Sequence, residues 1–210
     1  MGIEERKERE KKMRRRQIMD AAKKTFAAKG FGGATIEDIA EEAEFSPATL
    51  YLYFKNKDEL HASLMLEMLD ILIEKMEGVY SQDGLSPEEK VKALEKALYE
   101  VYEYDTMNVI NVLRFQSSEA LRNLSPELSS RIKDHSRNYL RAIAGIFEDG
   151  MQEGVFLERH PIAFADIVWA VFTGLVLWEH TKKGFDSSKD FLRPTLGLAI
   201  EIISKGIKKN

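Results

Sequence analysis

Apolar residues recur at spacings of three and four along almost the whole chain, and no segment shows sustained alternation of apolar and polar residues. Spacings of three and four place side chains on one face of an α-helix, whereas alternation is typical of a half-buried strand. The sequence therefore predicts an all-α fold of about nine helices. Two short helices are expected after Thr35 and Ser46, and the longer ones cover residues 10–29, 57–79, 87–104, 106–122, 126–154, 162–183 and 188–207.

Three residues have the side chains that start helices. Thr35, Ser46 and Asn56 each precede a segment with helical periodicity, and their oxygen atoms can accept from free backbone N–H groups of the first turn. An acidic residue stands three positions after two of them, Asp38 after Thr35 and Glu59 after Asn56. This spacing predicts a capping box at both helix starts.

The stretch SPATLYLYFKNKDEL, residues 46–60, has more aromatic side chains than its short helix can bury. On a helical wheel Leu50 and Phe54 face the interior. The outward face has a small or apolar centre with tyrosines at its edges, and consists of Ala48, Thr49, Tyr51, Leu52 and Tyr53. A short helix, a tight turn and a second helix with such a face indicate a helix-turn-helix, whose second helix enters the DNA major groove. The alternative for the tyrosines is packing against the first helix.

Lys57 adds a second indication of DNA binding. It is expected in the first turn of a long helix, where a cation opposes the helix dipole at a cost of roughly 0.3–1 kcal/mol. A DNA phosphate would remove this conflict and accept from the free N–H groups. The alternative is a solvated lysine offset by Asp58 and Glu59.

The pattern T-x-x-x-I-A-x-x-A over residues 35–43, followed by residues 46–60, resembles the DNA-binding domain of the tetracycline-repressor (TetR) family. The resemblance covers about 50 residues, and its helix caps, T-L-Y-x-Y-F core and K-x-K-x-x-L pattern occur in order. It implies a homodimeric transcription factor, usually a repressor, that leaves DNA when a small molecule binds its C-terminal domain. Two-fold symmetry of such a dimer predicts a palindromic operator.

The resemblance also implies which residues contact DNA. Thr35 and Thr49 correspond to hydroxyls that contact phosphates, and Pro47, Ala48 and Tyr51 correspond to residues facing the groove. The other tyrosine and the lysines correspond to anchors on the DNA backbone. The full expected set is Thr35, Ser46, Pro47, Ala48, Thr49, Tyr51, Tyr53, Lys55 and Lys57.

Glu44 departs from the family pattern, which usually has glycine at this position of the turn. If the backbone there is left-handed, a residue other than glycine costs roughly 1–2 kcal/mol.

Basic residues are concentrated in KKMRRR, residues 11–16, although the formal net charge of the chain is −4. Arg14, Arg15 and Arg16 are expected either to reach phosphates or the minor groove as a basic arm, or to form a solvated extension of the first helix.

Composition and hydropathy bound the cellular setting. The chain has no cysteine, and its charged N-terminus has no apolar segment of the kind a signal peptide requires. The longest apolar run, residues 164–178, contains Asp166 and is shorter than the roughly 20 residues that span a bilayer. A cytoplasmic protein without membrane contact is expected.

The sequence divides into a DNA-binding part, residues 1–58, and an effector-binding and dimerisation part, residues 59–210. Residues 162–183 and 188–207 are apolar on more than one side, which predicts that these two helices pair with a second copy. Polar and aromatic residues inside apolar runs are the candidate ligand contacts. They are Tyr102, Asn111, Arg114, Phe115, Glu119, Tyr139, Trp169 and Thr173. Their composition favours a hydrophobic effector.

Enzymatic motifs are absent from the sequence. It has no G-x-S-x-G, no phosphate-binding glycine loop and no H-E-x-x-H, and its four histidines lack metal-ligand spacing. No enzyme activity, cofactor or metal is expected. Two alternatives remain: a helical ligand-binding protein with a non-functional helix-turn-helix, and a DNA binder that responds to no effector.

Overall fold

The computed structural model describes residues 2–116, 124–186 and 190–209. Within these residues the chain is helical apart from turns and an isolated bridge between Phe156 and Lys208, as the periodicity predicts. The helices are α1 (Ile3–Gly33), α2 (Ile36–Glu42), α3 (Pro47–Tyr51), α4 (Lys57–Tyr80), α5 (Pro87–Tyr104), α6 (Thr106–Gln116), α7 (Pro126–Gln152), α8 (Pro161–Phe185) and α9 (Leu192–Gly206).

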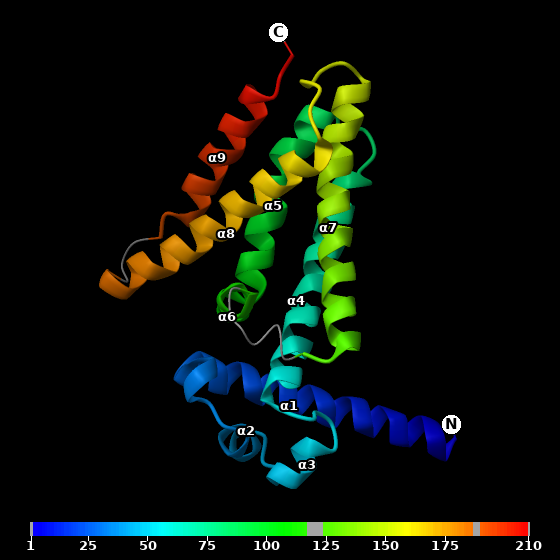
Figure 1. Ribbon diagram of the computed structural model, residues 1–210, viewed down its shortest axis with the longest axis vertical. Coiled ribbons are helices and arrows are strands. Elements are labelled where there is room, and N and C mark those ends of the chain that lie inside the picture. Colours follow the sequence, from blue (N-terminus) through cyan, green and yellow to red (C-terminus); the bar gives the residue numbers. More distant parts are fainter. Residues whose placement is uncertain (1, 117–123, 187–189, 210) are drawn as a thin grey trace.

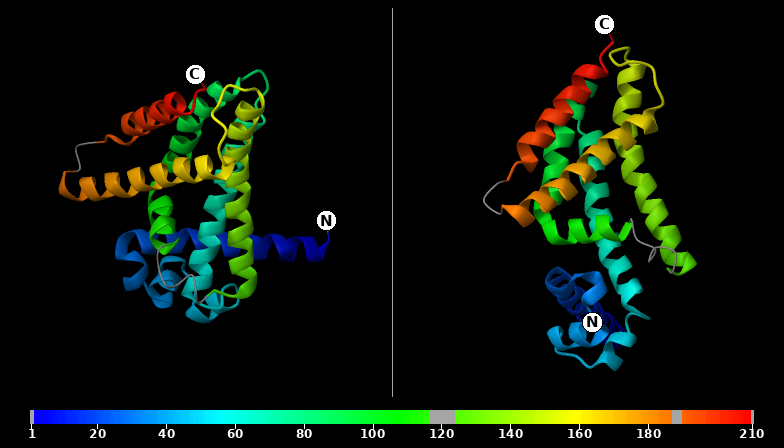
Figure 2. Two further views of the ribbon diagram at one scale, coloured as in Figure 1. Left: turned by 45° about the horizontal axis from the view of Figure 1, so that its top comes forward. Right: turned by 60° about the vertical axis from the view of Figure 1, so that its left-hand side comes forward.

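The helices form two units joined by α4 (Figure 1). Helices α1, α2 and α3 make the lower unit, and α4 rises from it to pack along α7 in the upper unit. Helices α5, α6, α8 and α9 complete the upper unit, with α8 and α9 along one side. Figure 2 shows the N-terminal half of α1 projecting past the rest of the molecule.

Each unit has its own core of buried apolar side chains. The lower core is built on Ile18, Phe26, Ile39 and Leu50, and it also includes Leu60 and Leu64 from α4. The upper core begins on α4 with Ala62 and Met65. We therefore propose a domain boundary inside the second turn of α4, slightly later than the expected one after residue 58.

Most expected helix bounds agree with the structure, and the differences have local causes. Helix α5 begins and ends where expected, whereas α3 is a turn shorter than the wheel implied. Helix α1 runs from Ile3 to Gly33, with Gly30 non-helical at φ 70° inside it. The expected stop at Gly30 is thus a kink, because glycine takes a positive φ without steric cost.

The three predicted N-caps are present. The Thr35 hydroxyl oxygen accepts from Asp38 N–H, and the Asp38 carboxylate accepts from Thr35 N–H. This capping box is therefore confirmed. Asn56 accepts from Glu59 N–H at 2.7 Å. The second capping box is wrong, because the Glu59 carboxylate accepts from Lys55 N–H at 2.6 Å instead.

Candidate nucleic-acid interface

Helices α2 and α3 are joined by a tight turn centred on Glu44. The Phe45 N–H donates to Ala40 O at 2.9 Å and the Glu44 N–H donates to Glu41 O at 3.1 Å. This pair of bonds is the Schellman motif, which closes the end of a helix with a left-handed residue. Glu44 has φ 57°, so the left-handed backbone considered from the sequence is confirmed at a non-glycine residue.

The outward face of α3 is exposed as predicted. Tyr51 is 54% exposed and Leu52 80% exposed, and Pro47 and Ala48 are exposed at the start of the helix. Leu50 is buried beneath them. The helix therefore presents small and apolar side chains that can approach base edges, with a phenol beside them.

Hydroxyl groups on this face are held by local hydrogen bonds. Ser46 Oγ lies 2.9 Å from Thr49 Oγ1 and accepts from Thr49 N–H at 3.2 Å. Thr35 Oγ1 accepts from Asp38 N–H, which leaves its own proton available to a phosphate oxygen. Tyr53 is half-buried and packs against the lower core, so packing holds most of this ring.

Lys57 has partners that the sequence argument missed. Its Nζ donates to Phe31 O at 2.7 Å and to Ala34 O at 2.9 Å, and it lies 4.5 Å from the Phe31 ring centroid. These carbonyls, at the end of α1, balance the charge that opposes the α4 dipole. The need for a phosphate, inferred from Lys57 alone, was wrong, although one N–H can still point outward.

Two arginines of the basic segment turn away from α3. Arg15 donates to Ser63 Oγ at 3.0 Å and lies 4.8 Å from the Phe54 ring centroid. Arg16 pairs with Glu67 at 2.7 Å. The segment is a helical extension of α1, but these two side chains bind α4 instead of being solvated as that alternative stated. Contact of the segment with DNA stays a prediction. Arg14 is exposed.

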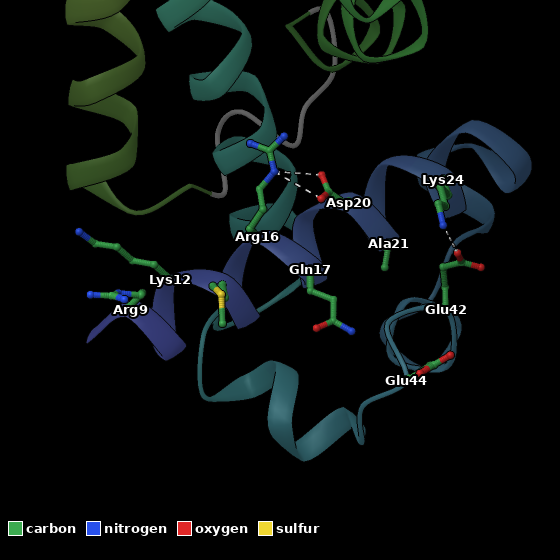
Figure 3. Close-up of a pocket in the computed structure, with 10 residues that line it drawn as sticks. Arg9, Lys12, Arg16, Gln17, Asp20, Ala21, Lys24, Glu42 and Glu44 are labelled. Carbon is green, nitrogen blue, oxygen red and sulfur yellow. Dashed lines mark hydrogen bonds and ion pairs between the residues drawn. The ribbon is translucent and has the colours of Figure 1, made fainter. Parts of the chain in front are cut away.

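A groove of about 670 Å³ runs along α1 toward the α2–α3 turn (Figure 3). Arg9 and Lys12 lie at one end, and Glu42 and Glu44 lie at the other. Only its N-terminal end therefore attracts phosphate, while the acidic end repels it.

A chain of ion pairs links the two units, and sequence reasoning did not find it. Lys23 on α1 lies 3.2 Å from Glu67 on α4 and 3.4 Å from Asp105. Asp105 accepts from Asn108 N–H in the first turn of α6. Helices α1, α4 and α6 thus meet at one lysine. Nothing in the local pattern marks this lysine, since its partners are far along the chain.

His61 lies one turn after Lys57 and is almost fully buried. Its ring lies between Phe26 and Phe31, with centroid distances of 5.1 and 4.9 Å. Burial, and next the charge of Lys57, lower the pKa of His61 to about 4. The imidazole is therefore neutral at pH 7 and packs as an aromatic ring.

Comparison with known proteins agrees with this geometry. Residues 18–64 match the family described as "Bacterial regulatory proteins, tetR family". The matched segment covers the lower core, the turn and α3. These residues therefore form a DNA-binding domain of the TetR type.

Similar proteins extend this likeness over most of the chain. The fatty acid metabolism regulator protein of Bacillus subtilis is 28% identical over 149 residues, which is 71% of this chain and 74% of that protein. The structure of B. subtilis FadR in complex with stearoyl-CoA has a TM-score of 0.68 at 26% identity, over 91% of this chain and 98% of that one. The TetR family regulator PfmR from Thermus thermophilus has a TM-score of 0.74 at 20% identity, over 91% of this chain and 99% of that one.

In the upper unit, two of the candidate ligand contacts meet. The rings of Tyr139 and Trp169 lie 4.7 Å apart between α7 and α8, and Phe172 lies 5.7 Å from Trp169. Tyr139 is 3% exposed, and burial raises the pKa of its hydroxyl. These residues form an aromatic cluster in which Trp169 is partly buried.

Other candidate contacts lie elsewhere. Tyr102 is buried on α5 and lies near Lys183. Lys183 follows Trp169 by about 20 Å along α8, at 1.5 Å per residue. Thr173 Oγ1 donates to Ala170 O within α8. The remaining four are Asn111, partly buried on α6, Arg114 and Phe115, placed in α6 by their backbones only, and Glu119, which lies outside the described residues.

Helices α8 and α9 expose a row of large apolar side chains. Trp178 is 60% exposed and Ile202 62% exposed. Other members are Ile167, Phe185, Phe191 and Leu198. By length and composition alone, α8 is also apolar enough to cross a membrane. Its other face packs into the upper core through Val168, Phe172 and Val176, as expected of a helix in a soluble bundle.

Proposed function

We propose that this TetR-family regulator is a cytoplasmic homodimeric repressor that binds a palindromic operator through α3 and is released by a hydrophobic effector. The observation that carries the proposal is the exposed face of α3. Ala48, Tyr51 and Leu52 are presented to solvent on a helix fixed by the Ser46 cap and the buried Leu50. A helix that exposes its apolar residues in this way requires a partner surface.

The exposed row on α8 and α9 is the proposed dimer interface. Trp178, Leu198 and Ile202 are each more than half exposed, and burying such side chains contributes about 25 cal/mol per Å² of apolar area. A second copy related by two-fold symmetry would cover the same row on both chains. It would also place two α3 helices on one side of the dimer, which is the arrangement that reads a palindrome.

A long-chain acyl group is the proposed hydrophobic part of the effector. The similar B. subtilis protein is named a fatty acid metabolism regulator, and the similar FadR structure holds stearoyl-CoA. In this chain Trp169 and Lys183, which lies near Tyr102, are about 20 Å apart along α8, a span that suits an extended acyl chain. The rings of Tyr139 and Trp169 lie 4.7 Å apart, so the acyl group would have to part these rings.

The structural change caused by effector binding would be transmitted to the DNA-binding unit through α4 and Lys23. Movement of α6 or α7 changes the positions of Asp105 and Glu67, which hold Lys23 of α1. The spacing between the two α3 helices would then change. Release requires that the effector bind the altered arrangement more tightly than the DNA-bound one.

Selection of bound sequences from a random double-stranded library tests the proposal. Wild type should enrich a palindrome, Tyr51→Ala should lose it, and Tyr104→Ala should keep it, because Tyr104 is similarly exposed at 61% but lies on α5. Stearoyl-CoA should then release the wild-type protein from the selected site.

Three outcomes would contradict the proposal. Failure to enrich any sequence at low salt would favour a ligand-binding protein with a non-functional helix-turn-helix. Enrichment that stearoyl-CoA and free fatty acids leave unchanged would favour a DNA binder without an effector. Equal losses for Tyr51→Ala and Tyr104→Ala would remove α3 as the reading element.

A further inference from the structure

A cleft of about 310 Å³ opens between α1, α4 and α7, where the DNA-binding unit meets the upper unit. Basic side chains outnumber acidic ones around it. The charged residues are Lys12, Arg15 and Arg16 from α1, Glu67 and Asp70 from α4, and Arg131 from α7. The cleft thus joins basic groups from both units of the chain.

The two acidic residues already have basic partners of their own. Glu67 pairs with Arg16 at 2.7 Å and with Lys23 at 3.2 Å. Asp70 lies 2.9 Å from His135 Nε2. Neither carboxylate lies within ion-pairing distance of the other cations of the cleft, namely Lys12, Arg15 and Arg131. His135 offsets the charge of Asp70 only when its imidazole is protonated.

Arg15 makes only neutral contacts at short range. Its guanidinium donates to Ser63 Oγ at 3.0 Å and to Met19 Sδ at 3.3 Å, and it stacks near the Phe54 ring. Burial, followed by the positive charge of Arg131, lowers the pKa of Arg15. The two guanidinium groups therefore repel each other across the cleft.

Arg131 lacks any compensating group in the described part of the chain, where no carboxylate oxygen lies within ion-pairing distance of it or of Arg15. Its side chain is exposed at the N-terminal end of α7. Two guanidinium groups and a lysine, drawn from opposite walls and without a described carboxylate at ion-pairing distance, form a preorganised site for an anion. Glu59 and Glu67 act on Arg15 only at longer range.

We infer that this cleft binds a phosphate-bearing ligand, held between Arg15 on α1 and Arg131 on α7. A phosphate group presents several oxygens and up to two negative charges, which match two forked donors better than a single carboxylate does. DNA bound to α3 is not the source, because α7, which supplies Arg131, and α3 lie on opposite sides of α1 (Figure 1). The source is a free inorganic anion or the phosphate group of a small molecule.

Occupancy of the cleft ties α1 to α7 and thereby fixes the orientation of the DNA-binding unit. This consequence rests on the proposed function, since it matters only if α3 binds an operator. The binding event itself does not, because it involves only α1, α4 and α7.

Calorimetric titration of the full-length protein at constant ionic strength tests the inference, with inorganic phosphate, pyrophosphate and coenzyme A as probes. Pyrophosphate should bind at one saturable site per chain. Arg131→Gln should weaken it about tenfold, the loss expected for one charged hydrogen bond. Lys133→Gln is the matched control: Lys133 is exposed on the same helix but lies outside the cleft, so its removal should leave binding unchanged.

The probes separate the two sources of phosphate. Coenzyme A binding more tightly than pyrophosphate, with the same loss in Arg131→Gln, assigns the site to a small molecule that carries phosphate. Tighter pyrophosphate binding assigns it to a free anion. Absence of saturable binding by all three probes, or an equal loss in Arg131→Gln and Lys133→Gln, overturns the inference.

Operator binding without added anion is measured in parallel. Wild type and Arg131→Gln should bind the selected operator equally well under that condition. A protein that binds no operator but retains the Arg131-dependent titration would contradict the proposed function and leave the anion site standing.

Discussion

Replacing Glu44 by glycine should stabilise this protein. Glu44 has φ 57° and occupies the position after the α2 C-cap, where helices that end in a Schellman motif usually have glycine. Its Cβ is forced toward the backbone in this conformation. Two hydrogen bonds require this left-handed conformation and close the turn before α3. They run from Phe45 N–H to Ala40 O and from Glu44 N–H to Glu41 O.

Two opposing terms set the magnitude. Relief of the left-handed strain contributes roughly 1–2 kcal/mol. The glycine variant also has more conformational entropy in its unfolded state, which lowers its free energy of unfolding by about 0.4–1 kcal/mol. The net gain is on the order of 0.5–1 kcal/mol, which raises Tm by about 1–4 °C in a chain of this size.

Urea unfolding followed by circular dichroism, at equal protomer concentration because dimers gain stability with concentration, measures the difference. Glu44→Ala is the control, since it removes the same charge but keeps the Cβ. Glu44→Gly is expected to be the most stable of the three proteins, above both Glu44→Ala and wild type. If Glu44→Ala matched Glu44→Gly, the gain would come from the charge, and the argument from backbone strain would be refuted.

Three further predictions concern buried groups. Lys57→Met should lower the free energy of unfolding by about 1–3 kcal/mol without DNA present, because two carbonyls lose a charged donor. Urea titration measures this difference. An unchanged free energy of unfolding would mean that Lys57 does not stabilise the fold and acts only on DNA. The pKa of His61 is lowered to about 4, so the unfolded chain, with a pKa near 6.5, takes up a proton first as pH falls. The free energy of unfolding should therefore drop by about 2 kcal/mol between pH 7 and pH 5, and this drop should be absent in His61→Leu. Gly150→Ala should destabilise by about 1–3 kcal/mol, because its Cβ would lie 2.1 Å from the Phe156 ring. Gly78→Ala, with no atom within 4 Å of its Cβ, should stabilise by up to about 1 kcal/mol. Urea unfolding measures both glycine variants.

The reading element was predictable from sequence because its determinants are local. The caps at Thr35 and Ser46 bond to N–H groups three residues away, and their spacing is visible in the chain. The wheel placed Leu50 inside and Tyr51 outside, as the structure does. Periodicity and capping act within one or two turns, so a single sequence determines them.

Charged side chains were predicted less well, because each had several possible partners. The sequence offers Glu59 both as a partner of Asn56 and as a partner of Lys55, and the structure selects Lys55. The arginines of KKMRRR were expected to reach either DNA or solvent, and neither alternative included the contacts that Arg15 and Arg16 make with α4. Long flexible side chains reach any of several groups, and only the position of the neighbouring helix decides among them.

The sequence by itself thus determined the all-α fold, the helix-turn-helix and the face of α3 that is exposed to solvent. Tertiary structure alone decided what surrounds that element. Lys57 bonds carbonyls 26 and 23 residues away, and Arg15 and Arg16 reach side chains 48 and 51 residues away. Contacts at such separations depend on how helices pack, which no local pattern encodes, and the cleft between Arg15 and Arg131 exists only because that packing brings α1 and α7 together.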